Sequence, residues 1–379
     1  MAEKTDLATL REVIERIDHD LLALLRERMD VMEGVARQKL QSAVPFRDPS
    51  REEQVLARVR AQAVKLKLDA HEVERLYRLI MEMAIARQQA HVGGLDATPL
   101  RVAYQGVEAS YSHLAAQQRY GGRQSGVVLE GYETIRQSID ALKRGEADYA
   151  FVPIENTAAG GLNETYDLLG EGGLTLTGEV LLNLHHCLLG LPGATLADLR
   201  TVRSHPQAFS QCARFLSSLP NVRLQPEMDT AGAARKVKAQ FDKHVAAIAS
   251  ASAAAQFGLE ILHSDIQGEE QHQTRFVEIA VEARPCPPDA NCKTSLLLTL
   301  EDRPGQLGEA LMVFARHGVN LNKLESRPVS RSPFRYGFYL EVEGHQASRE
   351  INAALTEVRG LHAEVRMLGT YPVAEEPRP

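Results

Sequence analysis

The spacing of hydrophobic residues predicts one long helix at the start of the chain. Over residues 6–42, apolar side chains recur at intervals of four and three, as on one face of an α-helix, with no internal proline. The residues of this apolar stripe are Leu10, Ile14, Ile17, Leu21, Leu24, Val31 and Val35. A helix of this length extends about 55 Å at about 1.5 Å per residue, and the shorter helices predicted at 49–66 and 70–91 do not cover it. We therefore expect the stripe to pair with another chain.

The hydrophobic pattern changes after "VGGLDATPL". From residue 100 to about residue 283, short apolar strands such as "RVAYQG", "ADYAFVPI", "TVRSHP" and "HVAAIAS" alternate with helical segments, which predicts an α/β domain. The stretch "RPCPPDANCK" at 284–293 is typical of a linker. Residues 294–370 then give strand, helix, strand, strand, helix, strand, which is the order of the ferredoxin-like unit.

These segments predict a multidomain fold class. A length of 379 residues at about 150 residues per domain favours two or three domains. We expect an all-α domain, an α/β domain and an α+β ferredoxin-like domain. Their predicted boundaries are 1–93, 100–283 and 294–371, with a tail at 372–379.

Composition and charge exclude several classes of function. Hydrophobic residues at 44% and charged residues at 25% are typical of a soluble globular protein. A formal net charge of -7 argues against a nucleic-acid partner, because neutralising phosphates requires a basic surface. The charged start "MAEKTDLATLREVIERIDHD" does not resemble a signal peptide, and no apolar run has the length of a membrane span. We expect a cytoplasmic protein with no membrane partner.

The cysteines give no sign of a metal site. Cys187, Cys212, Cys286 and Cys292 show neither the spacing of zinc ligands nor a disulfide framework. We expect free thiols, no metal and no cofactor.

Cations lie on the inward face of the long helix. Between Leu24 and Val31 the apolar stripe requires a residue that the sequence supplies as Arg28, and Lys39 lies about 20° away on the same face at about 100° per residue. Arg11 points about 100° away from Arg28 and is displaced by about 25 Å, so only a crossed or antiparallel partner chain would bring it to the same site. A single helical arginine is usually a surface residue, but grouped buried cations need anions.

Carboxylates follow these cations at the start of the next helix. The stretch "RDPSRE" supplies Asp48, Arg51 and Glu52. Asp48 and Glu52 do not neutralise all the cations, so we expect a small dicarboxylate ligand between the helices.

A polar cluster follows a strand in the α/β domain. In "FVPIENTAAGGLNETYDLL" (151–169), an apolar strand runs into "ENT" and then into Gly160 and Gly161 before a helix begins. Ligands of open parallel sheets bind beyond the carboxyl ends of the strands, and glycines let a backbone approach a ligand closely. This strand end is therefore a candidate binding site.

Short motifs along nearly the whole chain point to one family. "LREVIERIDHDLLALLRER", "RDPSRE" and "RQQA" resemble an all-helical chorismate mutase; "YQGVEASYSHLAA", "DYAFVPIENT", "HHCLL", "SHPQAFSQC" and "TRF" resemble a prephenate dehydratase; "GQLGEAL" and "LESRP" resemble its phenylalanine-sensing ACT domain. Each motif is weak alone. In this order, the set resembles the bacterial bifunctional chorismate mutase–prephenate dehydratases.

The resemblance implies an enzyme of phenylalanine biosynthesis. It would rearrange chorismate to prephenate, then decarboxylate and dehydrate prephenate to phenylpyruvate, with feedback inhibition by L-phenylalanine. The α/β domain would be two-lobed and similar to periplasmic binding proteins. The helical domain would form an intertwined dimer, so a homodimer or higher homo-oligomer is expected.

The resemblance also assigns the mutase substrate-binding and catalytic residues. They are Arg11, Arg28, Lys39, Asp48, Arg51, Glu52, Ala84 and Gln88, with Arg11 supplied by the partner chain. The rearrangement is intramolecular, so it needs a held conformer and donors to the ether oxygen, here Lys39 and Gln88, rather than a nucleophile. Glu52 and Asp48 would orient the substrate hydroxyl. Ala84 replaces a serine that is usual in the family, which removes one donor.

In the dehydratase, the resemblance makes Thr274 of "TRF" the catalytic residue. The implied substrate-binding residues are Ser110, Ser112, Glu155, Asn156, Thr157, Ser204, His205, Gln207, Gln211, Arg275 and Phe276. A threonine hydroxyl is too weak an acid to give up its proton fully, so Thr274 is expected to donate a hydrogen bond to the leaving hydroxyl. Read alone, the serines are ordinary N-caps and His205 a turn residue.

The ACT motifs imply a phenylalanine site. Its residues would be Gly305, Gln306, Leu307, Asn320, Leu321, Glu325, Ser326 and Arg327. Gln306 replaces the alanine common in the family, a change expected to alter sensitivity to the effector. Read alone, 325–327 is a surface turn.

Three other interpretations stay open. A non-catalytic amino-acid sensor would be expected to carry a DNA-binding helix-turn-helix, which the charge-balanced helical segment does not resemble. A monofunctional dehydratase with a decayed mutase is disfavoured by the retention of Arg11, Arg28, Lys39, Glu52 and Gln88. A periplasmic solute binder is disfavoured by the charged N-terminus.

Overall fold

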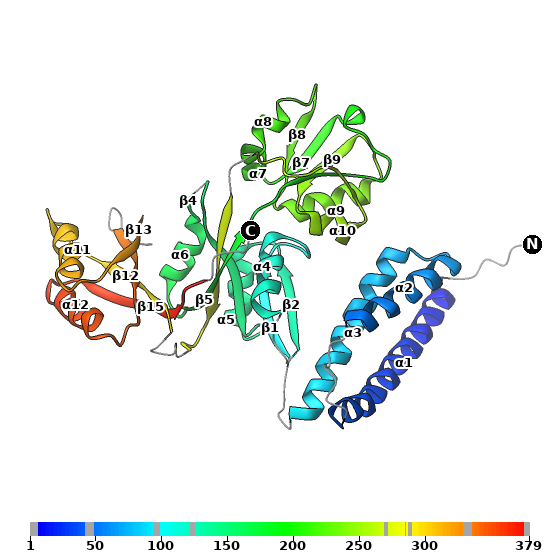
Figure 1. Cartoon of the computed structure of the whole chain (residues 1–379), viewed down its shortest axis with the longest axis horizontal. Coiled ribbons are helices and arrows are strands. Elements are labelled where there is room, and N and C mark those ends of the chain that lie inside the picture. The colour runs from blue at the N-terminus through cyan, green and yellow to red at the C-terminus, as the bar shows by residue number, and fades with distance from the viewer. Residues whose placement is uncertain are drawn as a thin grey trace, which may run out of the picture. The chain divides into compact units, whose positions relative to one another are not determined.

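The computed structural model divides into two compact units. One comprises residues 1–100 with 123–128, and the other comprises 101–122 with 129–379 (Figure 1). The structure describes residues 7–41, 49–93, 99–121, 126–158, 160–268, 272–284, 286, 290–328 and 336–374. Within these ranges, the side chains of residues 7–8, 32–41, 49–50, 82 and 85–93 lie outside the description.

The first unit contains three helices that we call the helical unit. They are α1 (Leu7–Gln41), α2 (Pro49–Lys65) and α3 (Ala70–Gly93). Both α1 and α2 pack against α3. The apolar stripe of α1 is nevertheless open to solvent in this single chain: Ile14 is 56% exposed, Leu21 54% and Leu24 61%. The long helix expected from the 4,3 spacing is present, and within its own chain its stripe is not covered.

A six-stranded sheet forms the core of what we call the first lobe. Its order is β2-β1-β3-β11-β5, with β4 added beside β3. Strands β1 and β3 are parallel, whereas β11 runs antiparallel to both β3 and β5. The elements are β1 (Leu100–Gln105), α4 (Tyr111–Tyr120), β2 (Val127–Tyr132), α5 (Ile135–Lys143), β3 (Tyr149–Asn156), β4 (Gly160–Gly161), α6 (Asn163–Glu171), β5 (Thr175–Asn183) and β11 (Gln273–Ala280).

The chain between β5 and β11 forms a second lobe. Its five-stranded sheet has the order β10-β6-β9-β7-β8, and β11 then returns the chain to the first sheet. The elements are β6 (Cys187–Gly190), η1 (Leu196–Asp198), β7 (Thr201–Ser204), α7 (Pro206–Gln211), α8 (Ala213–Leu216), β8 (Arg223–Pro226), α9 (Thr230–Gln240), β9 (Val245–Ala249), α10 (Ala251–Phe257) and β10 (Glu260–His263). The two sheets form separate lobes joined by the segments after β5 and before β11 (Figure 1).

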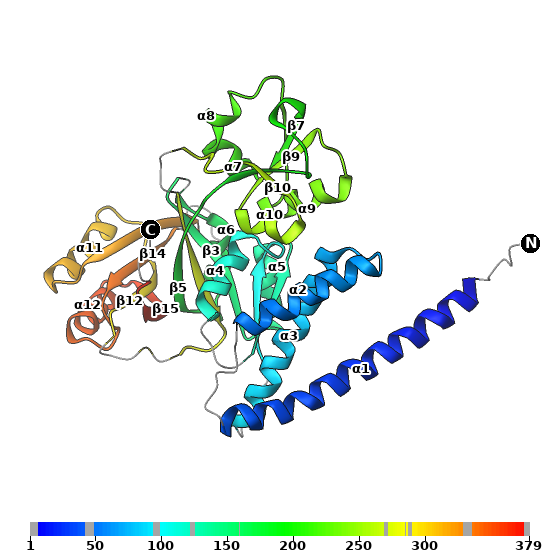
Figure 2. The same cartoon turned by 45° about the vertical axis from the view of Figure 1, so that its right-hand side comes forward.

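The last part of the chain forms a small domain, here the C-terminal domain. It has the predicted order of strands and helices, in an antiparallel sheet β13-β14-β12-β15. Helices α11 and α12 lie on one side of this sheet (Figure 2). The elements are β12 (Cys292–Thr299), α11 (Gln306–Arg316), β13 (Leu321–Pro328), β14 (Tyr336–Glu343), α12 (Arg349–Gly360) and β15 (Glu364–Pro372).

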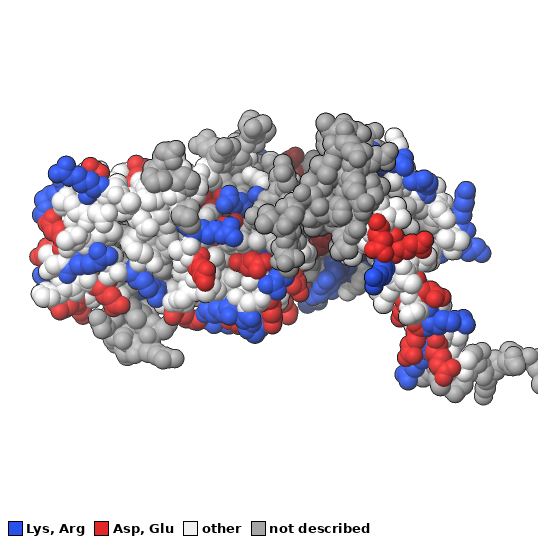
Figure 3. Space-filling model, turned by 90° about the horizontal axis from the view of Figure 1, so that it is seen from below, with Lys and Arg blue, Asp and Glu red and all other residues white. Residues whose placement is uncertain are grey.

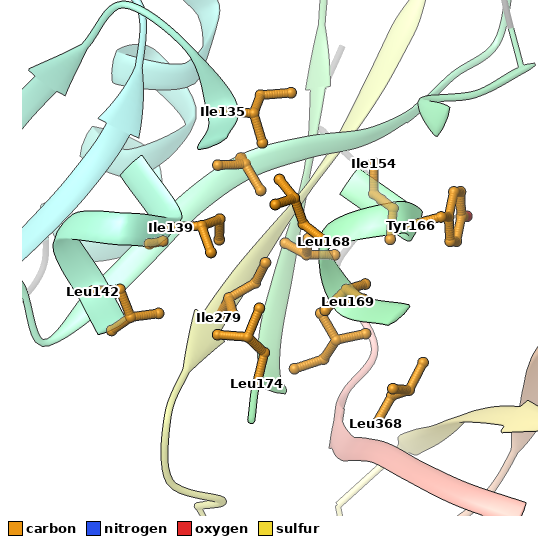
Figure 4. Close-up of a cluster of buried hydrophobic side chains, with 14 of the residues drawn as sticks. Ile135, Ile139, Leu142, Ile154, Tyr166, Leu168, Leu169, Leu174, Ile279 and Leu368 are labelled. Carbon is orange, nitrogen blue, oxygen red and sulfur yellow. The ribbon is translucent and has the colours of Figure 1, made fainter. Parts of the chain in front are cut away.

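The other face of this sheet shares a core with the first lobe. Leu168 and Leu169 of α6 pack in one buried cluster with Leu368 of the C-terminal domain (Figure 4). Tyr339 and Tyr371 of the same domain belong to this cluster. The Tyr339 hydroxyl also donates a hydrogen bond of 2.6 Å to the backbone oxygen of Tyr166. The C-terminal domain is thus packed on the first lobe rather than merely linked to it.

Two of the four cysteines are paired, which corrects the expectation of free thiols. Cys286 and Cys292 form a disulfide, whereas Cys187 and Cys212 are free and buried. The two cysteines are six residues apart, and Cys292 is the first residue of β12; their spacing alone did not reveal the pairing.

Surface charge is mixed on the face drawn in Figure 3. There, described Lys and Arg side chains are interspersed with Asp and Glu. In the part of the chain that the structure describes, no helix has the length and apolar character needed to cross a membrane. The same residues contain no group of three or more His, Cys, Asp or Glu side chains placed to hold a metal ion.

We expect Gly369→Ala to destabilise the contact between β15 and β5. Gly369 has φ 146, and a β-carbon there would lie 2.1 Å from the carbonyl oxygen of Leu176. The backbones must therefore separate, at a cost of about 3 kcal/mol in the free energy of unfolding. Urea unfolding followed by tyrosine fluorescence measures this, since the chain has no tryptophan.

Gly360→Ala is the matched control, because nothing lies within 4 Å of a β-carbon at that position. Equal unfolding midpoints for the two variants would contradict the close approach of β15 to β5.

Candidate active site between the lobes

A buried hydrogen bond joins the ends of two neighbouring strands of the first lobe. Asn156 ends β3 and pairs with Thr274 of β11. The Asn156 Nδ2 atom donates to Thr274 Oγ1 over 2.7 Å, and the two residues are 3% and 7% exposed. The structure therefore brings these two predicted site residues together.

The direction of this hydrogen bond follows from a backbone contact. The amide of Ala158 donates to Asn156 Oδ1 over 2.9 Å. A backbone N–H can only donate, so the side-chain oxygen of Asn156 is fixed on that side and its NH₂ group faces Thr274. Thr274 Oγ1 accepts from Asn156, and the threonine hydroxyl keeps its own hydrogen to donate to a ligand.

The second lobe extends this network. Gln211, the last residue of α7, places Nε2 3.5 Å from Asn156 Oδ1 and Oε1 2.8 Å from His186 Nε2. The other ring nitrogen of His186 lies 2.9 Å from the hydroxyl of Tyr111 in α4. Because Oε1 of Gln211 can only accept, Nε2 of His186 carries a proton. Burial lowers the pKa of His186 below its ordinary value, which favours the neutral Nε2–H tautomer.

A β-bulge aims Asn156 into this network. Arg275 pairs with Glu155 and Phe276 with Pro153, so Ile154 has no residue opposite it on β11. The extra residue reverses the alternation of side chains beyond it. Pro153 suits the irregular position, because it has no N–H to contribute to the ladder.

Helix N-termini from both lobes lie near the predicted site motifs. Ser110 caps α4 by accepting from the His113 amide over 3.3 Å, and Ser110 and Ser112 are buried. His205 caps α7 through Nδ1, which accepts from the Gln207 amide over 3.2 Å. Burial lowers the pKa of His205. Ser110 is therefore an N-cap, as its position alone indicated, and His205 is the N-cap of α7. The helix N-termini that they cap are suited to anions.

Of three further predicted residues, Ser204 and Thr157 make local side-chain hydrogen bonds and, among the described residues, Gln207 does not. Ser204 is buried and donates to the carbonyl of Ile248 over 2.8 Å within the second lobe. Thr157 accepts from the Gln273 amide over 3.0 Å at the strand ends. The side-chain nitrogen of Gln207 is buried without a hydrogen-bond partner among the described residues.

Glu155, Arg275 and Phe276, which the resemblance also assigns to substrate binding, lie away from the bond between Asn156 and Thr274 and make other contacts in this structure. Arg275 points to the opposite face of β11 from Thr274 and makes two bonds of 2.6 Å to Glu341 of the C-terminal domain. Glu155 pairs with Lys323 at 2.6 Å. Phe276 is 2% exposed and packs in the sheet interior. Successive strand residues face opposite sides, so "TRF" does not put the threonine and the arginine in one site.

The predicted effector residues divide between two places. Gln306 is 1% exposed and donates from Nε2 to the carbonyl of Leu361 over 3.0 Å. Arg327 instead donates to both carboxylate oxygens of Asp167 in α6, over 3.0 and 2.8 Å. Ser326, the next residue along β13, is exposed.

The remaining predicted effector residues lie near Gln306 or near Arg327. A β-carbon on Gly161 would be 3.0 Å from Glu325 Oε2, so Glu325, like Arg327, faces the first lobe. Gly305 precedes α11 with φ 84, and Leu307 is half-buried on that helix. Asn320 donates to Asn322 over 3.0 Å, and Leu321 pairs with Val342.

In the helical unit, the predicted mutase residues are partly described. Arg28 is half-buried and donates to the carbonyl of Ile80 over 3.4 Å. Arg11 and Arg51 are exposed. The remaining ones fall into two groups: Glu52 and Ala84 are described, with Glu52 Oε1 and the Ala84 side chain buried, whereas Lys39, Asp48 and Gln88 lie outside the described side chains.

Sequence reasoning missed His186 and Tyr111 as members of the network. The motif "HHCLL" pointed to the right segment, but nothing in it distinguishes His185 from His186. In the structure His185 is exposed and pairs with Asp265 at 3.1 Å, whereas His186 is 1% exposed.

The fold and the site define a multidomain enzyme with a hydrogen-bond donor held between two lobes and a small domain packed behind it. Family models match in this order: chorismate mutase type II over residues 10–89, prephenate dehydratase over 102–284 and the ACT domain over 294–360. The chain is 37% identical over 377 residues to the bifunctional chorismate mutase/prephenate dehydratase of Escherichia coli K12, covering 98% of this chain and 97% of that protein. The chain belongs to the bifunctional chorismate mutase/prephenate dehydratase family.

Two solved structures are similar to the part beyond the helical unit. Prephenate dehydratase from Arthrobacter aurescens in complex with L-Phe matches with a TM-score of 0.67 and 29% identity, covering 72% of this chain and 90% of that one. GqqA, described as a quorum quenching acylase, matches with a TM-score of 0.65 and 36% identity, covering 72% of this chain and 97% of that one.

We expect Gln211→Glu to raise the pKa of His186. The new carboxylate would face Nε2 and stabilise the imidazolium more strongly than the hydrogen bond to the native amide oxygen does. An NMR titration of the His186 ring protons in both proteins measures the change.

His205 serves as the internal reference, because its ring accepts from the Gln207 amide rather than contacting Gln211, and burial lowers its pKa as well. A His186 pKa that stays where it is in the native protein would show that Gln211 does not face the ring.

Proposed function

We propose that this chain rearranges chorismate to prephenate in the helical unit and converts prephenate to phenylpyruvate between the two lobes. The observation that carries the second activity is the fixed direction of the bond from Asn156 to Thr274, which leaves a threonine hydrogen for the substrate. Membership of the family supports both activities. L-Phenylalanine would be the feedback inhibitor, acting through the C-terminal domain.

The dehydratase reaction needs help for one leaving group. As the ring carboxylate of prephenate departs as carbon dioxide, its bonding electrons enter the ring, and the 4-hydroxyl leaves and takes up a proton to become water. Thr274 donates a hydrogen bond to this hydroxyl as negative charge grows on it. The N-termini of α4 and α7 receive the carboxylates. Gln211 and His186 hold Asn156 from the second lobe.

The mutase needs no proton transfer. Arg28 of one chain and Arg11 of its partner bind the two carboxylates of chorismate, because guanidinium groups bind carboxylates in a bidentate manner. Lys39 and Gln88 donate to the breaking ether oxygen, where one preorganised donor contributes about 3 kcal/mol. Asp48 and Glu52 orient the hydroxyl, with Arg51 and Ala84 completing the site.

The open apolar stripe of α1 supports a homodimer. Its leucine and isoleucine side chains are about half exposed in one chain, and an exposed stripe of this length normally pairs with another apolar surface. A second copy would cover the stripe and bring Arg11 to the neighbouring site. Oligomers beyond the dimer are compatible with this arrangement.

We also propose a more specific fold for the two lobes and for the C-terminal domain. The two lobes joined by two crossing segments are consistent with the periplasmic-binding-protein arrangement, with the substrate between the lobes. The C-terminal domain is consistent with a ferredoxin-like ACT domain, and its effector site would involve Gly305 to Leu307, Asn320, Leu321 and Glu325 to Arg327. We place the enzyme in the cytoplasm.

We expect Thr274→Val to separate the two activities. Valine has a similar shape but no hydroxyl, so prephenate turnover should fall about 100-fold to 1,000-fold while chorismate consumption stays within about twofold of the native rate. Purified protein supplied with chorismate, with prephenate and phenylpyruvate followed over time, gives both rates. Equal loss of both in a folded protein would contradict separate sites.

We expect subunits with different mutase lesions to complement each other. Arg11→Ala and Arg28→Ala chains should each lose mutase activity, but one site of a mixed dimer would hold both native arginines. Coexpression with two affinity tags isolates the mixed dimer, which should recover up to about half of the native activity per dimer. Mixed dimers as inactive as their parents would rule out shared sites.

A further inference from the structure

A cluster of buried ions lies where the C-terminal domain packs on the first lobe. Arg275 bonds Glu341 through both terminal nitrogens at 2.6 Å and lies 3.4 Å from Glu155. Lys323 pairs with Glu155 at 2.6 Å. Lys293 completes the group, 2.8 Å from Glu179 and 3.6 Å from Glu341. We call these six residues the ion cluster.

The ion cluster is balanced in charge, and its side chains are largely buried except that of Glu155, which is 36% exposed. It combines three cations with three carboxylates, and each domain contributes members of both signs. The side chains of Arg275 and Glu341 are 10% and 7% exposed, and that of Glu179 is 2% exposed. Burial raises the pKa of Glu341, but the bonds and charge of Arg275, together with the charges of Lys293 and Lys323, hold that pKa below its ordinary value. Removing one charge would leave its partner buried and unpaired.

The ion cluster is joined directly to the catalytic network. Arg275 follows Thr274 in β11, and Glu155 precedes Asn156 in β3. Arg275 pairs with Glu155, and Thr274 pairs with Asn156, at neighbouring positions of the same ladder next to the bulge at Ile154. The charged pair lies on one face of the sheet and the polar pair on the other. The charges of the C-terminal domain thus hold one face of the two strands whose other face carries the hydroxyl and the amide.

We propose that Glu341 and Lys323 of the C-terminal domain are positioning residues for the dehydratase site, acting on Thr274 through Arg275 and on Asn156 through Glu155. The inference rests on the proposed dehydratase function and adds a role for the C-terminal domain in basal catalysis. Glu341 sets the position of Arg275, and Arg275 sets where Thr274 lies relative to Asn156. Substrate does not contact Glu341 or Lys323 in this scheme.

A second ion pair across the same domain contact provides the matched control. Arg327 donates to both carboxylate oxygens of Asp167, so Asp167→Asn and Glu341→Gln each neutralise a carboxylate that an arginine grips with two bonds. Asp167 lies on α6, outside the catalytic strands. The Asp167 side chain is 44% exposed and that of Glu341 is 7% exposed, so the two substitutions need not destabilise the domain contact equally. If the ion cluster only held the domains together, however, kcat of the folded protein would be alike in the two variants.

The experiment compares kcat and KM for prephenate in the full-length protein. We expect Glu341→Gln to lower kcat at least tenfold with KM changed less than threefold, Asp167→Asn to leave both within twofold, and Glu341→Asp to recover part of the loss by restoring the charge. Mutase activity, measured in the same samples, reports the integrity of the chain. Equal effects of Glu341→Gln and Asp167→Asn on kcat would overturn the proposal.

Deuterium exchange gives a readout that does not depend on substrate. Glu341→Gln should increase deuterium uptake at residues 273–276, whereas Asp167→Asn should not. In this segment the Thr157 amide donates to the Gln273 carbonyl, and the Gln273 amide donates to the Thr157 hydroxyl. If wild-type protein failed to turn over prephenate, the proposed function would fall, and exchange at these residues would still decide the coupling. Unchanged exchange in Glu341→Gln would overturn it.

A double variant covers the case in which Glu341→Gln does not fold. Arg275→Met with Glu341→Leu removes one cation and one carboxylate together, leaving no net charge behind, and such exchanges for apolar residues are often tolerated. A folded double variant should still show the lower kcat. Native kcat in this variant would overturn the positioning role.

Discussion

The bulge at Ile154 decides which side chains meet in this molecule. Beyond Pro153, β3 carries one residue more than the facing part of β11, and the alternation of side chains shifts by one position. Asn156 therefore faces the same side as Thr274, whereas Glu155 shares the opposite side with Arg275. Without the extra residue the amide and the carboxylate would exchange faces, and neither the hydrogen-bond network nor the ion cluster could form.

The two faces of these strands obey different electrostatic rules. On the lobe side, the groups around Thr274 are amides, a hydroxyl and a neutral imidazole, and the backbone donor at Ala158 sets the direction of the bond from Asn156 to Thr274. On the domain side, full charges are buried and can persist only in balanced pairs. Arg275 and Glu179 would lack Glu341 and Lys293 if the C-terminal domain were absent. The first lobe therefore needs the C-terminal domain to pair its buried charges. It also needs that domain to cover its apolar surface, because the two share the core around Tyr339.

Much of the fold could be predicted from the sequence, because it depends on local periodicity. The 4,3 spacing gave α1, and the order of strands and helices after residue 293 gave the C-terminal domain. The motifs also identified the family, because each motif is a short continuous stretch of sequence that is recognised without knowing the fold. The site was harder: "TRF" places two polar residues side by side in sequence but on opposite faces of a strand. Knowing that requires the pairing of β3 with β11.

Long-range pairing also explains the other errors. The bulge is visible only when both strands are aligned, since nothing in "FVPIEN" marks Ile154 as the residue without an opposite. His186 joins the network through Gln211 and Tyr111, each about 25 or more positions away in the chain. The disulfide joins Cys286 to Cys292, and the composition of the linker does not specify this pairing.

The difference between the two faces offers a route by which an effector bound to the C-terminal domain would act on the proposed dehydratase site. A ligand shifts an equilibrium only through a difference in its affinity for two arrangements. Breaking one pair of the ion cluster leaves an unpaired charge in a buried site, which is costly. The C-terminal domain is therefore expected to change between discrete positions on the first lobe rather than to shift continuously. Thr274 needs to move only a few tenths of an ångström to lose its alignment with Asn156. A rearrangement of the C-terminal domain that carries Glu341 away from Arg275 would therefore reach the hydroxyl through one peptide unit.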